Sequence, residues 1–116
     1  MAKPVVYFEL GGKDLDAAGS FYASVFDWQI TPMPDGSYAS VNTGNGSLGG
    51  GLTGSDEPGT VISIEVDDIP ATLAAIEGKG GSTVIPETVM PGIVTYAVFK
   101  DPAGNTLGLI KSGDPA

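Results

Sequence analysis

The chain has 116 residues, no cysteine and no histidine, and 14 acidic residues against five lysines and no arginine, for a formal net charge of −9. These absences exclude disulfides, zinc–thiolate sites and thiol nucleophiles, and they remove the commonest general base and the arginine clamp for anionic substrates. Nucleic acid and anionic membrane surfaces are not expected as partners, because both require clustered positive charge. The acidic balance permits a cationic ligand.

The length predicts one domain with an ordinary hydrophobic core. No apolar run is long enough to span a membrane, and the N-terminal residues lead directly into a strand pattern without a signal peptide. We therefore expect a cytoplasmic protein.

The first half of the chain predicts one helix and four strands. Apolar residues recur at helical spacing over residues 15–25, and Asp14 is a suitable N-cap. Three consecutive glycines, Gly49–Gly51, predict a place where a backbone or ligand approaches closely. The strands are expected, in chain order, over residues 4–10, 28–33, 38–42 and 47–52.

The first predicted strand alternates between an apolar and a mixed face. Phe8 and its neighbours of the same parity form the apolar face. Val5, Tyr7 and Glu9 lie on the other face. This second face is neither core nor plain surface, so it is a candidate ligand-binding face.

The same order of elements returns after a polar linker over residues 54–59. Val61, Ser63 and Glu65 share one face of the next strand, and Asp67-Asp68 caps a helix that ends at Gly80-Gly81. The segment Glu87–Gly92 is expected to be a loop, and Asp101-Pro102-Ala103-Gly104-Asn105 a hairpin turn. The remaining strands are expected over residues 82–86, 93–99 and 106–110.

The two halves form an internal repeat. An offset of 56 residues superimposes Val5 on Val61, Tyr7 on Ser63 and Glu9 on Glu65. The predicted fold is α+β, with two βαβββ modules over residues of about 3–53 and about 60–111. Each module has one helix on the outer face of a curved, mostly antiparallel sheet, and the sheets surround a cavity.

Three segments together resemble the vicinal oxygen chelate superfamily, which contains glyoxalase I, the bleomycin-resistance proteins and the extradiol dioxygenases. They are Phe21-Tyr22-x-x-Val25-Phe26-x-Trp28, Ile64-Glu65-Val66-Asp67-Asp68 and Asp101-Pro102-x-Gly104-Asn105. The resemblance covers nearly the whole chain and is specific for the fold. It does not specify a reaction, because one fold hosts many chemistries.

The resemblance implies four positions where metal-dependent members carry His or Glu ligands. In this sequence they fall on Val5, Val61 and, in the last strand of each module, about Gly51 and Gly108. None of these side chains can ligate a metal. A shift of two residues would introduce Tyr7 or Ser63 but no histidine. We therefore expect no metal and no cofactor, and neither glyoxalase nor dioxygenase activity.

The leading functional hypothesis is a metal-free protein that sequesters a small cationic or aromatic molecule, as in the bleomycin-resistance branch. Tyrosine rings suit such a ligand by stacking and cation–π contact, and Glu9 adds a negative charge. The candidate ligand-binding residues are Val5, Tyr7, Glu9, Tyr38, Gly51, Val61, Ser63, Glu65, Tyr96 and Gly108.

Two alternatives stay open. One is a lyase or isomerase in which Glu9 and Glu65 act as acid and base, since two carboxyl groups brought close together shift one another's pKa. The same pair is equally compatible with two solvated glutamates at strand ends. The other is a non-catalytic interaction protein, and the resemblance implies a homodimer.

Overall fold

The computed structural model describes residues 2–44, 46 and 48–113. It is an α+β protein with two compact units, which we call the N-terminal unit (Tyr7–Val61) and the C-terminal unit (Met1–Val6 with Ile62–Ala116). The first strand therefore contributes to both units, because the Pro4 carbonyl accepts a hydrogen bond from the Glu65 N–H at 2.9 Å. Within the described residues, neither helix is long and apolar enough to cross a membrane.

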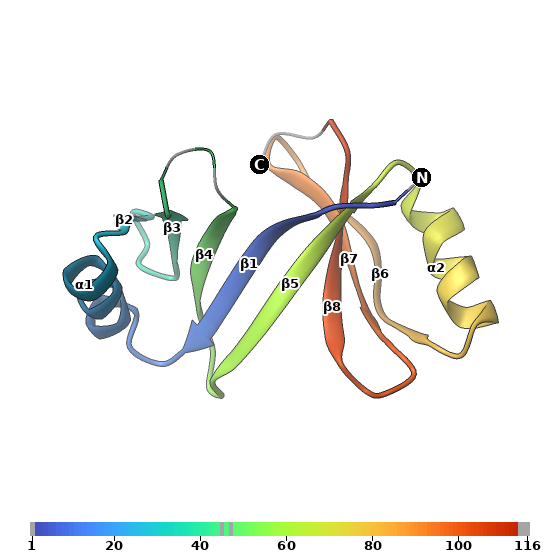
Figure 1. Ribbon diagram of the computed structural model, residues 1–116, viewed down its shortest axis with the longest axis horizontal. Coiled ribbons are helices and arrows are strands. Elements are labelled where there is room, and N and C mark those ends of the chain that lie inside the picture. The colour runs from blue at the N-terminus through green and yellow to red at the C-terminus, as the bar shows by residue number, and fades with distance from the viewer. Residues whose placement is uncertain (1, 45, 47, 114–116) are drawn as a thin grey trace. The chain divides into compact units, whose positions relative to one another are not determined.

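The N-terminal unit contains a sheet with the strand order β2-β3-β4-β1, and β1 and β4 run parallel while the other pairs are antiparallel. The helix α1 packs on one face of it (Figure 1). This is the βαβββ module predicted from the sequence. Its elements are β1 (Val5–Gly12), α1 (Leu15–Phe26), β2 (Gln29–Pro32), β3 (Tyr38–Asn42) and β4 (Gly49–Gly54).

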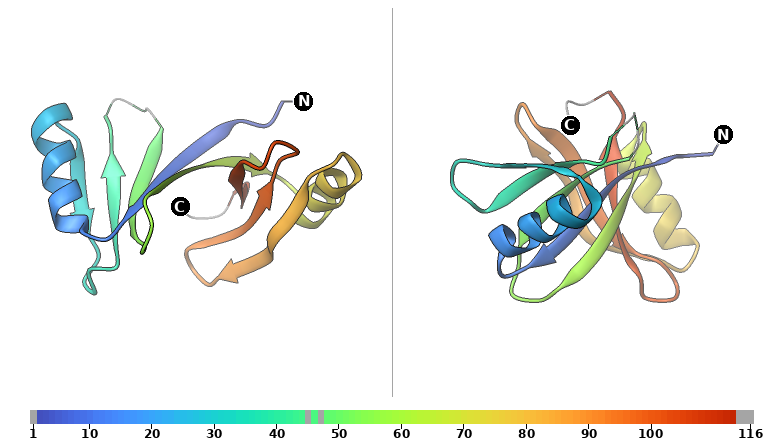
Figure 2. Two further views of the ribbon diagram at one scale, coloured as in Figure 1. Left: turned by 90° about the horizontal axis from the view of Figure 1, so that it is seen from below. Right: turned by 60° about the vertical axis from the view of Figure 1, so that its left-hand side comes forward.

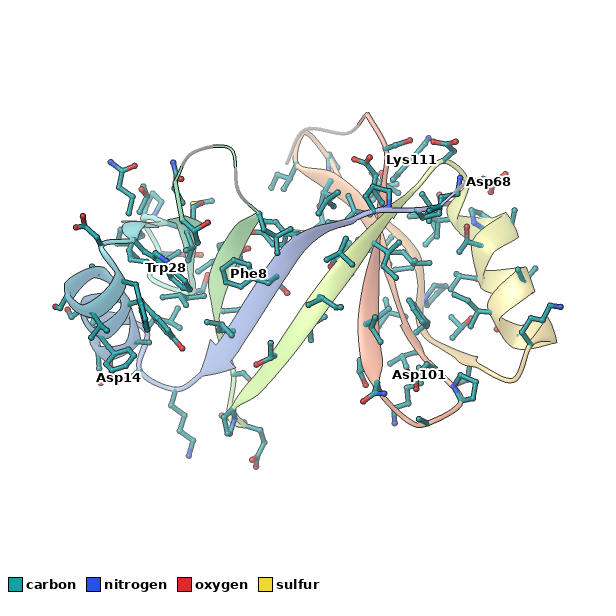
Figure 3. The ribbon with its side chains drawn as sticks, viewed as in Figure 1. Phe8, Asp14, Trp28, Asp68, Asp101 and Lys111 are labelled. Atoms are coloured by element: carbon teal, nitrogen blue, oxygen red, sulfur yellow. The ribbon has the colours of Figure 1, made fainter. Side chains whose placement is uncertain are left out.

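The core of the N-terminal unit lies between α1 and the sheet. Leu52 is fully buried at its centre, and Ala39 and Val41 of β3 are almost fully buried beside it. The ring centroids of Phe8 and Trp28, labelled in Figure 3, lie 5.8 Å apart. The predicted alternation of β1 between an apolar face and a mixed face is confirmed. The partly buried side chains packed against this core are Phe8, Leu10, Leu15, Ala18, Tyr22, Trp28 and Ile30.

The C-terminal unit repeats the arrangement with the strand order β5-β8-β7-β6, and β5 and β8 are parallel. The helix α2 lies against one face of the sheet (Figure 2), over a core that includes the fully buried Ile69 and the almost fully buried Leu109. Its elements are β5 (Gly59–Val66, whose first residues belong to the N-terminal unit), α2 (Ile69–Gly78), β6 (Ser82–Met90), β7 (Val94–Lys100) and β8 (Thr106–Lys111).

Two expectations about loops were wrong. The segment Glu87–Met90 is not a loop but the second half of β6, because Thr88, Val89 and Met90 pair with β7. Two register shifts flank Ile85, and the second of them contains Pro86, whose missing N–H interrupts the ladder without ending the strand. The linker is also shorter than predicted and consists of residues 55–58, since both neighbouring strands extend into it.

The predicted caps and turns are confirmed. Asp14 and Asp68 each accept a hydrogen bond, at 3.0 Å, from the backbone N–H three residues further on. The Asp101 carboxylate accepts hydrogen bonds from the side chain and the backbone N–H of Asn105 and from the Ala103 N–H, all at 2.9 Å, which lowers the pKa of Asp101. This turn joins the antiparallel strands β7 and β8. Ser47, where the fourth strand was expected to begin, lies outside the described residues.

Candidate functional site

The candidate site lies on the face of the N-terminal sheet opposite α1. Tyr7 and Glu9 come from β1, and their parity places them away from Phe8 and the core. Tyr38 begins β3, where it alternates with the buried Ala39. The strand β4 lies between β1 and β3, so side chains from those two strands meet above β4.

These three side chains form a hydrogen-bonded chain, which we call the Tyr7–Tyr38–Glu9 network. The Tyr38 hydroxyl donates to Oε2 of Glu9 at 3.3 Å, and the hydroxyl groups of Tyr7 and Tyr38 are hydrogen-bonded to each other. All three residues are partly buried. Two phenol rings, two hydroxyl groups and one carboxylate therefore converge on one sheet face.

The glycines of β4 make room for these rings. A Cβ atom on Gly51 would overlap the hydroxyl group of Tyr38, and one on Gly50, which faces the core, would overlap the ring of Phe8. A Cβ on Gly49 would lie 3.9 Å from the Tyr7 ring, which is ordinary van der Waals contact. The close approach predicted for the Gly49–Gly51 run is thus made by the protein's own side chains.

The environment keeps both tyrosines neutral. Burial raises the pKa of Tyr7, and the negative charge of Glu9 acts in the same direction against the opposing effect of the bond to Tyr38. Burial also raises the pKa of Tyr38, and its contacts with Tyr7 and Glu9 raise it further. Both phenols consequently keep their protons well above neutral pH and act as hydrogen-bond donors.

The strand register revises the internal repeat. Both first strands have eight residues and end two residues before an aspartate cap, at Asp14 and Asp68, so the structural offset is 54 rather than 56. Glu9 pairs with Gly51 and Ser63 pairs with Gly108. The counterpart of Glu9 is therefore Ser63, and the predicted equivalence of Glu9 with Glu65 was wrong.

In the C-terminal unit the equivalent position is smaller and more enclosed. Ser63 is 8% exposed, and its Oγ would lie 2.5 Å from a Cβ on Gly108. Tyr96 occupies the register position of Tyr38, since Tyr96 pairs with Ile110 as Tyr38 pairs with Thr53. Glu65 pairs with the same Ile110 from the other side.

The predicted site residues are thus divided between the units. Tyr7, Glu9, Tyr38 and Gly51 are brought together, and Ser63 packs on Gly108. Glu9 and Glu65 belong to different units, and their predicted action as a pair stays a prediction. The remaining three residues do not join the network: Val5, 43% exposed in the C-terminal unit, Val61, at the end of the N-terminal unit, and Tyr96, in β7 of the C-terminal unit.

The sequence placed Tyr38 among the candidate ligand-binding residues but did not predict its hydrogen bond to Tyr7. A usable signal was present in β3. Ala39 and Val41 are apolar, whereas Tyr38, Ser40 and Asn42 share the other parity. That alternation places Tyr38 on the face of the sheet away from the core.

The residues do not fit the metal implied by the fold resemblance. Within the described ranges no group of three or more His, Cys, Asp or Glu side chains could hold a metal ion. At Gly51 and Gly108, the positions expected to carry ligands, the hydroxyl groups of Tyr38 and Ser63 fill the space of a side chain. The donor set is therefore hydroxyl-rich and offers a single carboxylate in the N-terminal network.

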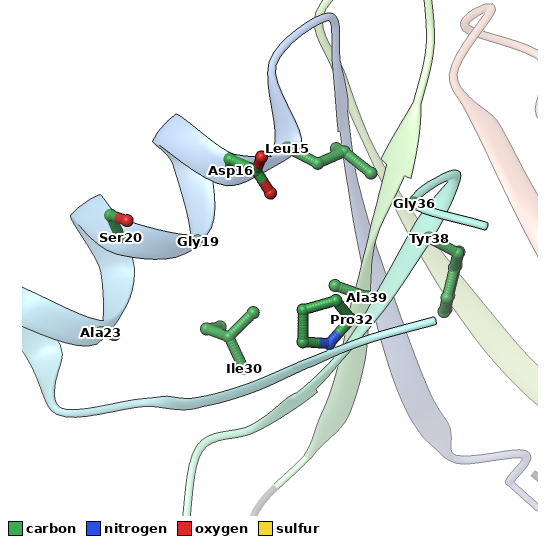
Figure 4. Close-up of a pocket in the computed structure, with 10 residues that line it drawn as sticks. All are labelled: Leu15, Asp16, Gly19, Ser20, Ala23, Ile30, Pro32, Gly36, Tyr38 and Ala39. Atoms are coloured by element: carbon green, nitrogen blue, oxygen red, sulfur yellow. The ribbon is translucent and has the colours of Figure 1, made fainter. Parts of the chain in front are cut away.

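A hollow lies on the helix side of the N-terminal sheet, between α1 and the edge strand β2 (Figure 4). Its volume is about 350 Å³ and its walls are mainly apolar. Its two polar side chains on α1, Asp16 and Ser20, are exposed. The lining residues are Leu15, Asp16, Gly19, Ser20, Ala23, Ile30, Pro32, Gly36, Tyr38 and Ala39.

Paired βαβββ modules with a polar network on one sheet face define an α+β protein of the vicinal oxygen chelate type. Residues 5–109 match the Glyoxalase/Bleomycin resistance protein/Dioxygenase superfamily, and the chain belongs to this superfamily.

Known proteins of several descriptions are similar to this chain. The anthracycline biosynthesis protein DnrV of Streptomyces peucetius is 26% identical over 128 residues, covering 92% of this chain and 46% of DnrV. The chain thus spans about half the length of the curated relatives it matches.

Solved structures that share the fold include a glyoxalase and an epimerase. A Mn(II)-bound glyoxalase from Novosphingobium aromaticivorans has a TM-score of 0.73 at 23% identity, over 99% of this chain and 42% of that one. A methylmalonyl-CoA epimerase from Mycobacterium tuberculosis has a TM-score of 0.72 at 15% identity, over 97% of this chain and 87% of that one.

Proposed function

We propose that the N-terminal unit binds a small aromatic or cationic molecule without a metal ion and holds it without chemical change. The observation that carries this proposal is the Tyr7–Tyr38–Glu9 network. Its rings offer stacking and cation–π surfaces, and its carboxylate offers a counter-charge.

The charge of the chain and the comparisons support the same ligand class. A net charge of −9 favours cations over anions near the protein. The match to a protein of anthracycline biosynthesis supports an aromatic ligand, because anthracyclines are fused-ring aromatic compounds. The hydroxyl groups that fill the space at Gly51 and Gly108 support metal-independent binding.

A second candidate is an enzyme of the lyase or isomerase type that moves a proton through Glu9. The hydrogen bond from the Tyr38 hydroxyl to Glu9 favours it, because a carboxylate beside a neutral phenol can accept a proton from a bound molecule. The fold shared with an epimerase is compatible with such a reaction.

A thermal-shift panel on chelator-treated protein tests the binding proposal. The compounds are 2-naphthylmethylamine as an aromatic cation, 2-naphthol as a neutral aromatic, 2-naphthoate as an anion, and divalent transition metals alone. A compound present at about 100 times its dissociation constant adds about 2.7 kcal/mol of stability, which is readily measured. We expect a shift with the first two compounds, and a shift with a metal alone would contradict the proposal.

Two matched substitutions locate the binding. Glu9→Gln should weaken the binding of 2-naphthylmethylamine by roughly 10- to 100-fold, the usual range for a charged hydrogen bond. Glu65→Gln removes the same charge from the C-terminal unit and should leave the affinity unchanged. Unchanged binding in both variants would remove Glu9 from the site, and equal weakening in both would mean that the amine responds to the overall charge of the protein and not to Glu9 in particular. Deuterium exchange into the bound compound, abolished by Glu9→Gln, would favour the enzyme instead.

A further inference from the structure

The donors and acceptors of the Tyr7–Tyr38–Glu9 network can be counted. Each tyrosine hydroxyl carries one proton and can accept through its lone pairs, whereas a carboxylate only accepts. The Tyr38 hydroxyl donates its proton to Oε2 of Glu9 at 3.3 Å. The bond between the two hydroxyl groups must then use the proton of Tyr7.

We propose that the Glu9 carboxylate fixes this donor order, so that the Tyr7 hydroxyl presents only lone pairs to a ligand. The site then selects an aromatic molecule that carries a hydrogen-bond donor, a hydroxyl or an ammonium group, and rejects one that offers only an acceptor. This inference rests on the proposed function and names its ligand class.

The surroundings of Tyr38 hold the order in place. Its hydroxyl lies directly over Gly51, where a side chain would otherwise be, and the ring is half-buried between β1 and β3. Burial keeps both phenols protonated, so neither becomes an acceptor by ionisation. If Tyr38 turned its proton toward Tyr7, the partly buried carboxylate would lose its donor, which is unfavourable for a charged group.

The C-terminal unit supplies a matched control. Tyr96 holds the register position of Tyr38, but the counterpart of Glu9 there is Ser63. Among the described residues the Tyr96 hydroxyl makes no hydrogen bond like that of Tyr38. Tyr96→Phe therefore removes the hydroxyl group at the equivalent position of the C-terminal unit and leaves the donor order of the N-terminal unit unchanged.

Neutron diffraction from crystals exchanged into D₂O tests the order directly and needs no ligand. We expect the deuteron of Tyr38 on the line to Glu9 Oε2 and the deuteron of Tyr7 on the line to the Tyr38 oxygen. A Tyr7 deuteron that points away from Tyr38 would overturn the inference.

The affinities of 2-naphthol and 2-methoxynaphthalene, which share one ring system and differ in a single donor proton, test the selectivity. We expect the wild-type protein and Tyr96→Phe to prefer 2-naphthol by about tenfold. In Tyr38→Phe the Tyr7 hydroxyl loses its acceptor and can donate its proton to a ligand. The preference for 2-naphthol should therefore fall below about threefold. Equal binding to the wild type would overturn the donor order alone, whereas failure of both compounds to bind would overturn the proposed function.

Discussion

The hydroxyl group of Tyr38 lies in the space that a Cβ atom on Gly51 would occupy. The two residues come from neighbouring antiparallel strands, and the absence of a side chain on the glycine leaves room for the Tyr38 hydroxyl group to reach Glu9. A glycine that looks like a weak point of β4 is therefore what allows the network to form.

Gly51→Ala should displace Tyr38 and break its bond to Glu9. We expect the free energy of unfolding to fall by about 1–3 kcal/mol, the usual range for inserting a methyl group into a filled space. The measurement is urea unfolding, with the NMR chemical shifts of the Tyr38 ring as a local readout.

Gly49→Ala is the matched control, two residues away on the same face of β4. Its Cβ would lie 3.9 Å from the Tyr7 ring, so we expect a change of stability within about 0.5 kcal/mol. Equal losses in the two variants would mean that the cost comes from the strand and not from Tyr38.

The raised pKa values of Tyr7 and Tyr38 predict that the protein loses stability at high pH. Both pKa values lie above the ordinary value of 10.0 in the folded state. As the pH rises past 10.0, the unfolded chain releases these protons before the folded one, so the free energy of unfolding decreases. The stabilising effect is fully present below that pH.

Urea unfolding between pH 8 and pH 11.5 measures this effect, and absorbance at the phenolate band reports the ionisation. We expect Tyr38→Phe to show a smaller decrease than the wild type over the same interval. An identical pH dependence in the two proteins would show that Tyr38 does not contribute to it.

Two glycines at the end of α2 should respond in opposite directions to alanine. A Cβ on Gly81 would lie 2.7 Å from the backbone carbonyl oxygen of Lys100 and 2.6 Å from Cγ2 of Ile76, and the carbonyl cannot move aside. We expect Gly81→Ala to destabilise the protein by about 2–3 kcal/mol.

Gly78 is the last residue of α2, and a Cβ atom added to it would meet no neighbouring atom within 4 Å. Gly78→Ala should stabilise the helix by about 0.5–1 kcal/mol, because alanine loses less conformational freedom. Thermal unfolding of both variants by circular dichroism measures the difference, and a loss of stability in Gly78→Ala would contradict the assignment of this residue to the helix.

Local chemistry made much of the fold predictable. The aspartate caps, the Asp101 turn and the alternation of Phe8 with Tyr7 are set by residues within a few positions of one another, and each was confirmed. Even so, β6 was predicted to end near Pro86. A proline breaks the local pattern, and only pairing with β7 shows that the strand continues through register shifts.

The amino-acid pattern was sufficient to predict the family, the two modules, the absence of histidine and cysteine ligands and the face that carries Tyr7 and Glu9. The folded structure was needed to show that Tyr38 joins them, that Gly51 makes room for its hydroxyl group and that Ser63 rather than Glu65 is the counterpart of Glu9. The physical reason is register. A shift of two residues preserves the face on which every side chain lies, so alternation in the sequence cannot detect it, whereas hydrogen-bonded strand pairing can.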